Sequence, residues 1–431
     1  MSTSGCGCLR SFSFNLFMNS IIRITSSLAL LLLTISGCTK NDNSGSPQTA
    51  SQQSPAPDQK RIAELGRKIF FDVRLSASGK QSCATCHNPG YAYAPANNLA
   101  VQLGGPQLDR QGARAVPSLR YVLNKTPFWH QPYVASLGER IQEGVESPSG
   151  GFAWDGRFNS LHEQAAFPLL AQNEMANASS REISKKLSDA DYAPQFRQAF
   201  GAEVFNSPQQ AYRFALQAIE QFELDDDSFH PYTSKFDAYL DGKAKLSAPE
   251  AHGLALFNDS TKGNCASCHI DTKGADGSHP LLTNYQHEAL GVPRNMEIKA
   301  NSDRDYYDKG VCGPARTALK NHPELCGLFK APTLRNVASR AAFFHNGYFH
   351  TLKSALQFYV QRDTNPERWY SHYGKQISKF DDLPPVERNN VDVIDLPLDN
   401  KQGAKPIWNE HDIDDVIAFL KTLTDHDVKN R

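Results

Sequence analysis

The chain has 431 residues, more than one domain usually holds, so two domains are expected. Its formal net charge is −1 at pH 7, so no basic surplus points to a nucleic-acid partner. Hydrophobic residues make up 40% of the chain, enough to fill ordinary cores, which excludes wholesale disorder.

Residues 1–37 have the features of a bacterial export signal. A short basic region precedes the apolar run Leu28–Ile35, and small residues follow it, as in secretory signals. The run is too short for a membrane-spanning helix. The tetrad ISGC that ends at Cys38 resembles a lipobox, which would make Cys38 a lipidated first residue; cleavage nearby without lipidation is the alternative. Met18 has the better spacing for the true start.

Residues 38–59 are rich in Ser, Gln and Pro and are expected to form a flexible tether. The signal and tether together predict a periplasmic protein that is anchored to the outer membrane by its lipid. No other membrane contact is expected.

Residues 60–246 are expected to form a first domain around one C-x-x-C-H motif, CATCH. A short helix is expected before it, over Glu64–Asp72. C-x-x-C-H is the attachment motif of a c-type haem. In this reading Cys83 and Cys86 form thioethers with the haem vinyl groups, and His87 ligates the iron.

Residues 247–431 are expected to form a second domain around a second copy, CASCH, with Cys265, Cys268 and His269 in the same roles. A single motif could be a redox dithiol, and paired C-x-x-C could bind zinc. The histidine directly after each cysteine pair, in both copies, favours two haems.

Two helices are expected in this second half. Ser247 to Glu250 form an S-x-x-E capping box with proline in the first turn, and Asp412–Asp425 carries an apolar stripe. Alternating strand patterns are scarce. The predicted class is therefore mainly α, with two cytochrome c-like haem domains.

Cys312 and Cys326 remain after the haem motifs are assigned. An exported protein folds in an oxidising compartment, so a disulfide between them is expected. Two free buried thiols are the alternative.

Four landmarks recur in the same order in both halves, which predicts an internal duplication. The pairs are Gly66-x-x-x-Phe70-x-Asp72 with Gly253-x-x-x-Phe257-x-Asp259, the two haem motifs, Pro117–Arg120 with Pro332–Arg335, and Phe152–Pro168 with Phe343–Tyr359. Aligned on glycine, the last pair sets Trp154 opposite His345 and Pro168 opposite Tyr359.

Pro168 and Tyr359 would give the two haems different sixth positions. A proline side chain cannot ligate iron, so the haem of His87 would stay open to a small molecule. A tyrosine can ligate, so the haem of His269 would be closed. One open and one closed haem suit an oxidoreductase. Met296 is the alternative ligand to Tyr359.

Gln164 and Glu174 lie close to Pro168 in the sequence. In a helix, Gln164 shares a face with Pro168. Glu174 over an open haem could take a proton from one oxygen of H2O2 and deliver it to the leaving oxygen. A solvated glutamate is the ordinary alternative.

The pattern WDGR-(x)6-Gln-(x)3-Pro-(x)5-Glu-Met, with two C-x-x-C-H motifs, resembles the bacterial di-haem cytochrome c peroxidase and MauG family over residues 60–425. The resemblance implies two covalently bound haem c groups. It places Trp154 between the haems and His345 near the second one. It also implies a catalytic pocket at the first haem, made by Gln164, Pro168 and Glu174. Tyr359 falls where the peroxidases carry an axial methionine and the MauG branch an axial tyrosine.

The resemblance implies H2O2 as substrate. Its second partner would be a small periplasmic donor, either a cytochrome c or a cupredoxin, or else a protein whose side chains are oxidised. Tyr359 favours the latter, and both stay open. A non-catalytic di-haem electron-transfer lipoprotein is the alternative from another class, and Pro168 argues against it.

Two departures from the family pattern stand out. The stretch Gln102–Leu119 lacks the histidine that closes the first haem in many of the peroxidases, so no reductive activation is expected; His130 is interpreted as a loop histidine. Ala115 replaces a calcium-ligating asparagine, which puts calcium between the haems in doubt, although backbone carbonyls could hold one.

Overall fold

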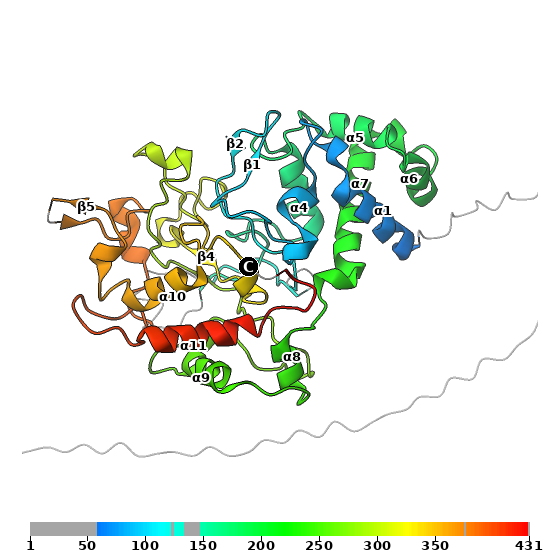
Figure 1. Ribbon diagram of the computed structural model, residues 1–431. Coiled ribbons are helices and arrows are strands. Elements are labelled where there is room, and N and C mark those ends of the chain that lie inside the picture. Colours follow the sequence, from blue (N-terminus) through cyan, green and yellow to red (C-terminus); the bar gives the residue numbers. More distant parts are fainter. Residues whose placement is uncertain (1–57, 122–124, 133–146, 375, 430–431) are drawn as a thin grey trace, which may run out of the picture. The chain divides into compact units, whose positions relative to one another are not determined.

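The computed structural model describes residues 58–121, 125–132, 147–374 and 376–429. The predicted signal, Cys38 and most of the tether lie outside these residues. Helices dominate the described ranges, and the strands there form two-residue pairs, which confirms the mainly α class (Figure 1). Within the same ranges, no helix has the length and apolarity needed to cross a bilayer.

The helices are α1 Gln59–Phe71, α2 Cys83–Cys86, α4 Leu161–Leu170, α5 Ser180–Ser188, α6 Ala193–Phe200, α7 Pro208–Asp225, α8 Lys235–Leu240, α9 Ala248–Asn258, α10 Leu352–Gln361 and α11 Glu410–Lys421. The antiparallel strand pairs are β1 Leu103–Gly104 with β2 Arg110–Gln111, β3 His287–Glu288 with β4 Phe329–Lys330, and β5 His372–Tyr373 with β6 Gln376–Ile377.

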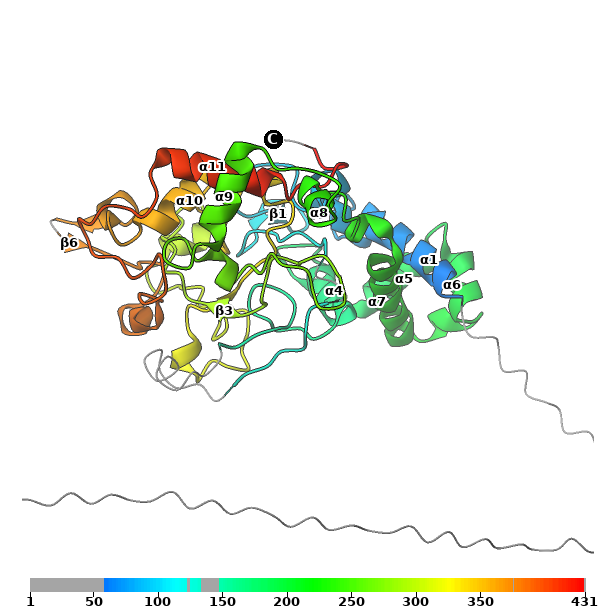
Figure 2. The ribbon, with the colours of Figure 1, turned by 90° about the horizontal axis from the view of Figure 1, so that it is seen from below.

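The first half is built on the crossing of α1 and α7, which lie side by side in both ribbon views (Figures 1 and 2). Gly66 permits the close approach, because a Cβ there would lie 1.8 Å from the carbonyl oxygen of Ala218. Phe70 is buried in the crossing and meets Phe222 edge-on, with ring centroids 5.5 Å apart. One apolar core runs through this half, from Leu65 to Phe229.

The second half repeats this arrangement with α9 and α11. A Cβ on Gly253 would lie 2.0 Å from the carbonyl oxygen of Asp415. Phe257 meets Phe419 edge-on at 5.2 Å. A second apolar core runs from Phe236 to Leu423.

The segments before α4 and α10 also share a conformation. Phe152 bridges to Phe158 and Phe343 bridges to Phe349, each closing a tight turn. In those turns φ is +64° at Gly156 and +65° at Gly347, a region that favours glycine. The two turns therefore deliver α4 and α10 to matching positions in their halves.

Candidate active site

A single cavity of about 520 Å³ is lined by both C-x-x-C-H motifs. The structure brings every predicted haem and pocket residue to it: Cys83, Cys86, His87, Trp154, Gln164, Pro168, Glu174, Cys265, Cys268, His269, His345 and Tyr359. Its walls come from both halves, so the two motifs face a common space.

The two motif histidines are prepared to ligate a metal. Nδ1 of His87 lies 3.0 Å from the carbonyl oxygen of Tyr93, and Nδ1 of His269 lies 2.9 Å from that of Leu282. A carbonyl only accepts, so Nδ1 carries the proton and Nε2 keeps a lone pair. Burial lowers the pKa of His87 to about 4 and also lowers that of His269, which keeps both rings neutral. A neutral ring oriented through its other nitrogen is typical of metal-ligating histidine.

The four motif cysteines form no disulfides and lie in an apolar setting. Burial raises the pKa of Cys83 and Cys265 to about 12 and that of Cys86 and Cys268 to about 11. A redox dithiol needs a thiolate, which forms where the pKa is lowered. The setting therefore disfavours a reactive dithiol, whereas an uncharged thioether to a haem suits it.

The repeated Pro-[Ser/Thr]-Leu-Arg segments support the loops behind the histidines. Ser118 Oγ donates to the carbonyl oxygen of Ala92 at 2.5 Å, and Thr333 Oγ1 donates to that of Leu281 at 2.7 Å. Ala92 directly precedes Tyr93, and Leu281 directly precedes Leu282, the two residues whose carbonyls bond the motif histidines. In both halves the hydroxyl thus anchors the peptide directly before the carbonyl that orients the histidine ring.

At the first motif, Gln164, Pro168 and Glu174 line the cavity from α4 and the turn after it. Pro168 lies inside α4 and cannot donate to the carbonyl of Gln164, which costs helix stability. The backbone of Glu174 is held by Gly105, whose N–H donates to its carbonyl at 2.7 Å. Burial raises the pKa of Glu174 to about 7, and Arg157 partly opposes this.

Sequence reasoning assigned no role to Arg157, although it belongs to the WDGR stretch. It lines the cavity, pairs with Asp155 at 2.9 Å and lies 4.5 Å above the ring of Phe167. Burial alone would raise the pKa of Asp155, yet Arg114 and Arg157 hold it below its ordinary value. Of these charges, that of Arg157 also acts on Glu174.

At the second motif, Tyr359 lines the cavity from α10. Burial, reinforced by the nearby Cys268, raises the pKa of its hydroxyl. Met296, the alternative ligand, is 64% exposed and is not among the cavity-lining residues.

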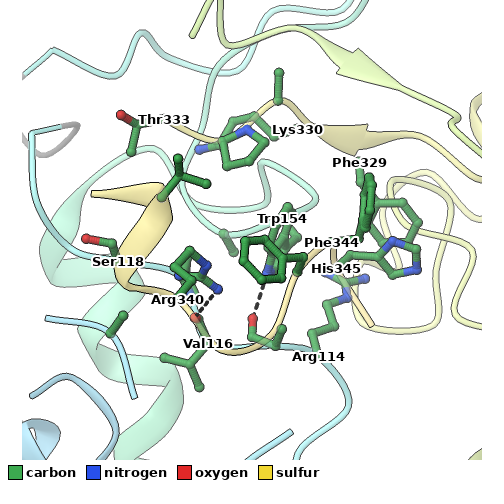
Figure 3. Close-up of a pocket in the computed structure, with 18 of the residues that line it drawn as sticks. Arg114, Val116, Ser118, Trp154, Phe329, Lys330, Thr333, Arg340, Phe344 and His345 are labelled. Atoms are coloured by element: carbon green, nitrogen blue, oxygen red, sulfur yellow. Dashed lines mark hydrogen bonds between the residues drawn. The ribbon is translucent and has the colours of Figure 1, made fainter. Parts of the chain in front are cut away.

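Hydrogen bonds join the two halves beside Trp154 (Figure 3). Trp154 Nε1 donates to the carbonyl oxygen of Ala115 at 2.8 Å, and the N–H of Ala115 donates to the carbonyl oxygen of His345 at 2.7 Å. The ring of His345 stacks on Phe329 at 3.5 Å, and Nε2 lies 3.2 Å from a carboxylate oxygen of Asp382. The ring of Trp154, which lines the cavity, is thereby tied to the segment that contacts His345.

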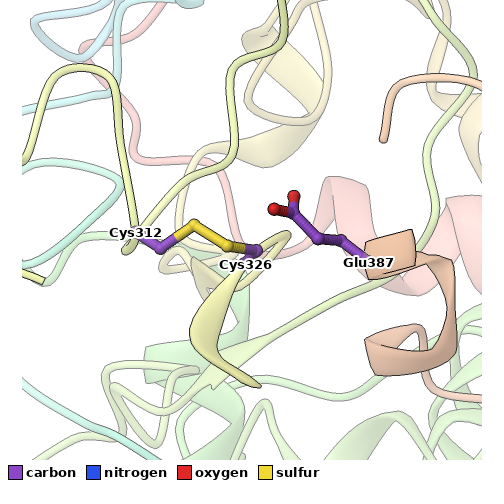
Figure 4. A group of neighbouring side chains, drawn as sticks. All are labelled: Cys312, Cys326 and Glu387. Atoms are coloured by element: carbon purple, nitrogen blue, oxygen red, sulfur yellow. A yellow bond between two sulfur atoms is a disulfide. The ribbon is translucent and has the colours of Figure 1, made fainter. Parts of the chain in front are cut away.

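Cys312 and Cys326 are joined by a disulfide outside the cavity (Figure 4). Both are 1% exposed, and Glu387 lies beside them and accepts from Lys309 Nζ at 3.0 Å. Among the described residues this is the one clustered set of potential metal ligands. Its two sulfurs are bonded to each other, so it offers no thiolate.

Comparisons with known proteins show which family the chain belongs to. The family described as di-haem cytochrome c peroxidase matches residues 60–245. The methylamine utilization protein MauG of Paracoccus denitrificans is 31% identical over 391 residues, covering 88% of this chain and 91% of its own. Cytochrome c551 peroxidase of Nitrosomonas europaea is 29% identical, covering 85% and 81%.

The crystal structure of the diheme peroxidase BthA from Burkholderia thailandensis superposes with a TM-score of 0.76 at 36% identity. The superposition covers 89% of this chain and 91% of that one. This chain therefore belongs to the di-haem cytochrome c peroxidase and MauG family, is an oxidoreductase of that type, and by membership is expected to carry two haems.

Proposed function

We propose that this protein is a periplasmic di-haem c-type peroxidase that reacts with H2O2 at its first haem and passes oxidising equivalents to its second. The observation that carries the proposal is the pair Pro168 and Tyr359. They occupy matching positions on α4 and α10 and line one cavity. Only one of them can ligate iron.

The residues present fit two covalent haems. Cys83 and Cys86 would hold the first, with His87 as ligand. The matching residues of CASCH would hold the second, with Tyr359 as its other ligand. When bound, each haem supplies an iron that exchanges electrons and, where a coordination position is free, accepts peroxide.

Glu174 would move the proton. With a pKa of about 7, its carboxyl can both accept and release a proton at neutral pH. It would take the proton from one oxygen of H2O2 and return it to the departing oxygen. Gln164 would orient the peroxide from the same wall. Arg157, held by Asp155, would keep the approach polar without donating a proton of its own.

The two halves, 60–246 and 247–431, are proposed to be cytochrome c-like domains that arose by duplication. Matching helix crossings at Gly66 and Gly253 support this, as do the matching turns at Gly156 and Gly347. Trp154 lines the cavity shared by both motifs and would conduct charge from one haem to the other.

The second haem would resemble that of MauG rather than that of a donor-reduced peroxidase. The cavity position of Tyr359 and the exposure of Met296 support this. The reaction partner would be a protein whose side chains are oxidised, or a small cytochrome c or cupredoxin donor. The predicted export signal and the lipobox-like position of Cys38 are the grounds for proposing a lipid-anchored position in the periplasm.

The ferric holoprotein, mixed with one equivalent of H2O2, tests this function. The visible spectrum should change on mixing, without prior reduction of the protein, because the proposed first haem has no sixth ligand that reduction would have to remove. A spectrum that stays unchanged would instead support a non-catalytic electron-transfer protein.

A further inference from the structure

Glu223 lines the cavity from α7, yet the proposed reaction does not use it. The residue is 3% exposed, and its Oε2 has no hydrogen-bond partner among the described residues. A buried carboxyl without a partner is costly when it is ionised. It lies near enough to Cys83 for its charge to act on that thiol.

The helix crossings allow Glu223 to be matched with a residue of the other half. Gly66 of α1 meets the carbonyl of Ala218 on α7, and Gly253 of α9 meets the carbonyl of Asp415 on α11. Ala218 and Asp415 are therefore equivalent. Counting residues forward from Ala218 on α7 and from Asp415 on α11 therefore aligns the two helices residue by residue.

In this register Glu223 stands opposite Leu420. The preceding pair, Phe222 and Phe419, confirms the match, because each meets the phenylalanine of its crossing edge-on. Leu420 is also 3% exposed and lines the cavity. The same place therefore holds a carboxyl at the first haem motif and an apolar side chain at the second.

Two titratable side chains that are more exposed than Glu223 lie near it. Glu220 lies one turn earlier on α7, and its Oε2 is 2.8 Å from Nδ1 of His162 on α4, which is 41% exposed. Burial raises the pKa of Glu223 to about 8, and Glu220 adds to the effect. The other titratable groups around Glu223 come from two elements. The buried face of α1 against α7 is apolar and supplies none. The α2 helix supplies Cys83, and the turn after α4 supplies Glu174, which lines the same cavity.

We propose that Glu223 compensates the charge of the first haem by exchanging one proton with solvent. When a one-electron donor reduces that haem, the carboxylate of Glu223 takes one proton by way of Glu220 and His162. When the electron leaves, the carboxyl releases the proton, so the net charge of the site stays constant. Charges buried together interact strongly, which supplies the coupling. The inference rests on the proposed attachment of a haem to Cys83 and Cys86.

The test is the midpoint potential of each haem against pH, from about pH 6 to about pH 10. It is measured on the holoprotein by spectroelectrochemistry. Glu174 also titrates in this cavity, so every variant carries Glu174→Gln. In that background the potential of the first haem should fall as pH rises, because the carboxylate stabilises the oxidised state. Adding Glu223→Gln should abolish the fall and leave the potential higher at alkaline pH.

Two matched variants complete the design. Glu223→Leu copies Leu420 and should also abolish the fall. Glu203→Gln removes an exposed carboxyl outside the cavity and should change nothing. The second haem should keep its potential in all of them.

An unchanged slope in Glu223→Gln, or an equal shift of both haems, would overturn the inference. Mass spectrometry of the Cys83–Cys86 peptide separates this from a failure of the proposed function. A peptide without haem would refute the attachment itself. A peptide with haem and an unaltered slope would refute the role of Glu223 alone.

Discussion

At the residue scale, the carboxyl of Glu174 combines a place in the cavity with a pKa of about 7. Glu174→Gln keeps the shape and removes the proton acceptor. The rate constant for reaction with H2O2 should fall by about 10²–10⁴-fold. In the wild type the rate should rise as pH increases through about 7, because only the carboxylate accepts a proton; in the variant that rise should disappear.

Stopped-flow absorbance over this pH range measures both effects. Glu203→Gln, an exposed glutamate outside the cavity, serves as the control and should react like the wild type. A Glu174→Gln rate equal to that of the control would remove Glu174 from the reaction.

Tyr359 and Met296 are the two alternative ligands of the second haem, and single substitutions distinguish between them. Tyr359→Phe deletes the hydroxyl and should change the absorption and electron paramagnetic resonance signals of one haem. Met296→Leu should leave both haems as they are, because the side chain is 64% exposed. The reverse pattern would make the second haem peroxidase-like, with methionine as ligand.

At the element scale, two helix crossings depend on glycine. A Cβ at Gly66 or Gly253 would lie about 2 Å from a backbone carbonyl, so each helix pair would have to separate. Gly66→Ala and Gly253→Ala should each lower the free energy of unfolding by about 1–3 kcal/mol or more. Gly112→Ala is the control, since its nearest neighbour would lie at 3.4 Å. Urea denaturation with equal losses in all three would contradict the close-crossing interpretation.

Local spacing predicted the elements well, and their ends less well. The helix expected over Glu64–Asp72 begins earlier, at Gln59, because Asp58 caps it by accepting from the N–H of Lys60. The last helix was expected to reach Asp425 but ends at Lys421. Asp425 instead turns away to accept from Arg120 and Tyr121 of the first half. No pattern within one helix contains such a distant partner.

The pocket residues were predictable because the family pattern spaces them along one short segment. Glu223 was not, because it reaches the cavity from a helix far along the chain from Cys83. A signal was nevertheless present. The stretches AIEQFE at 218–223 and DVIAFL at 415–420 share an aliphatic residue and a phenylalanine at matching places. Extending the internal repeat to these helices would have set the glutamate against the leucine.

At the scale of the whole molecule, a buried ion pair between Arg120 and Asp425 connects the two halves. Asp425 of the second half accepts from Arg120 Nη1 at 3.0 Å and from the hydroxyl of Tyr121 at 2.5 Å, and all three residues are at most 2% exposed. Arg120→Met should destabilise the protein by about 3–5 kcal/mol, because it leaves Asp425 buried without its cation. Scanning calorimetry should show the loss, with Arg181→Met, an exposed arginine, as control.

The division between one open and one closed haem is tested most directly by cyanide titration of the ferric holoprotein as isolated. In the proposed arrangement Pro168 leaves the first haem open and Tyr359 closes the second, so one equivalent of cyanide should bind per chain at the titration end point. Tyr359→Phe should raise the number to two. Binding of no cyanide, or of two equivalents by the wild type, would contradict the asymmetry.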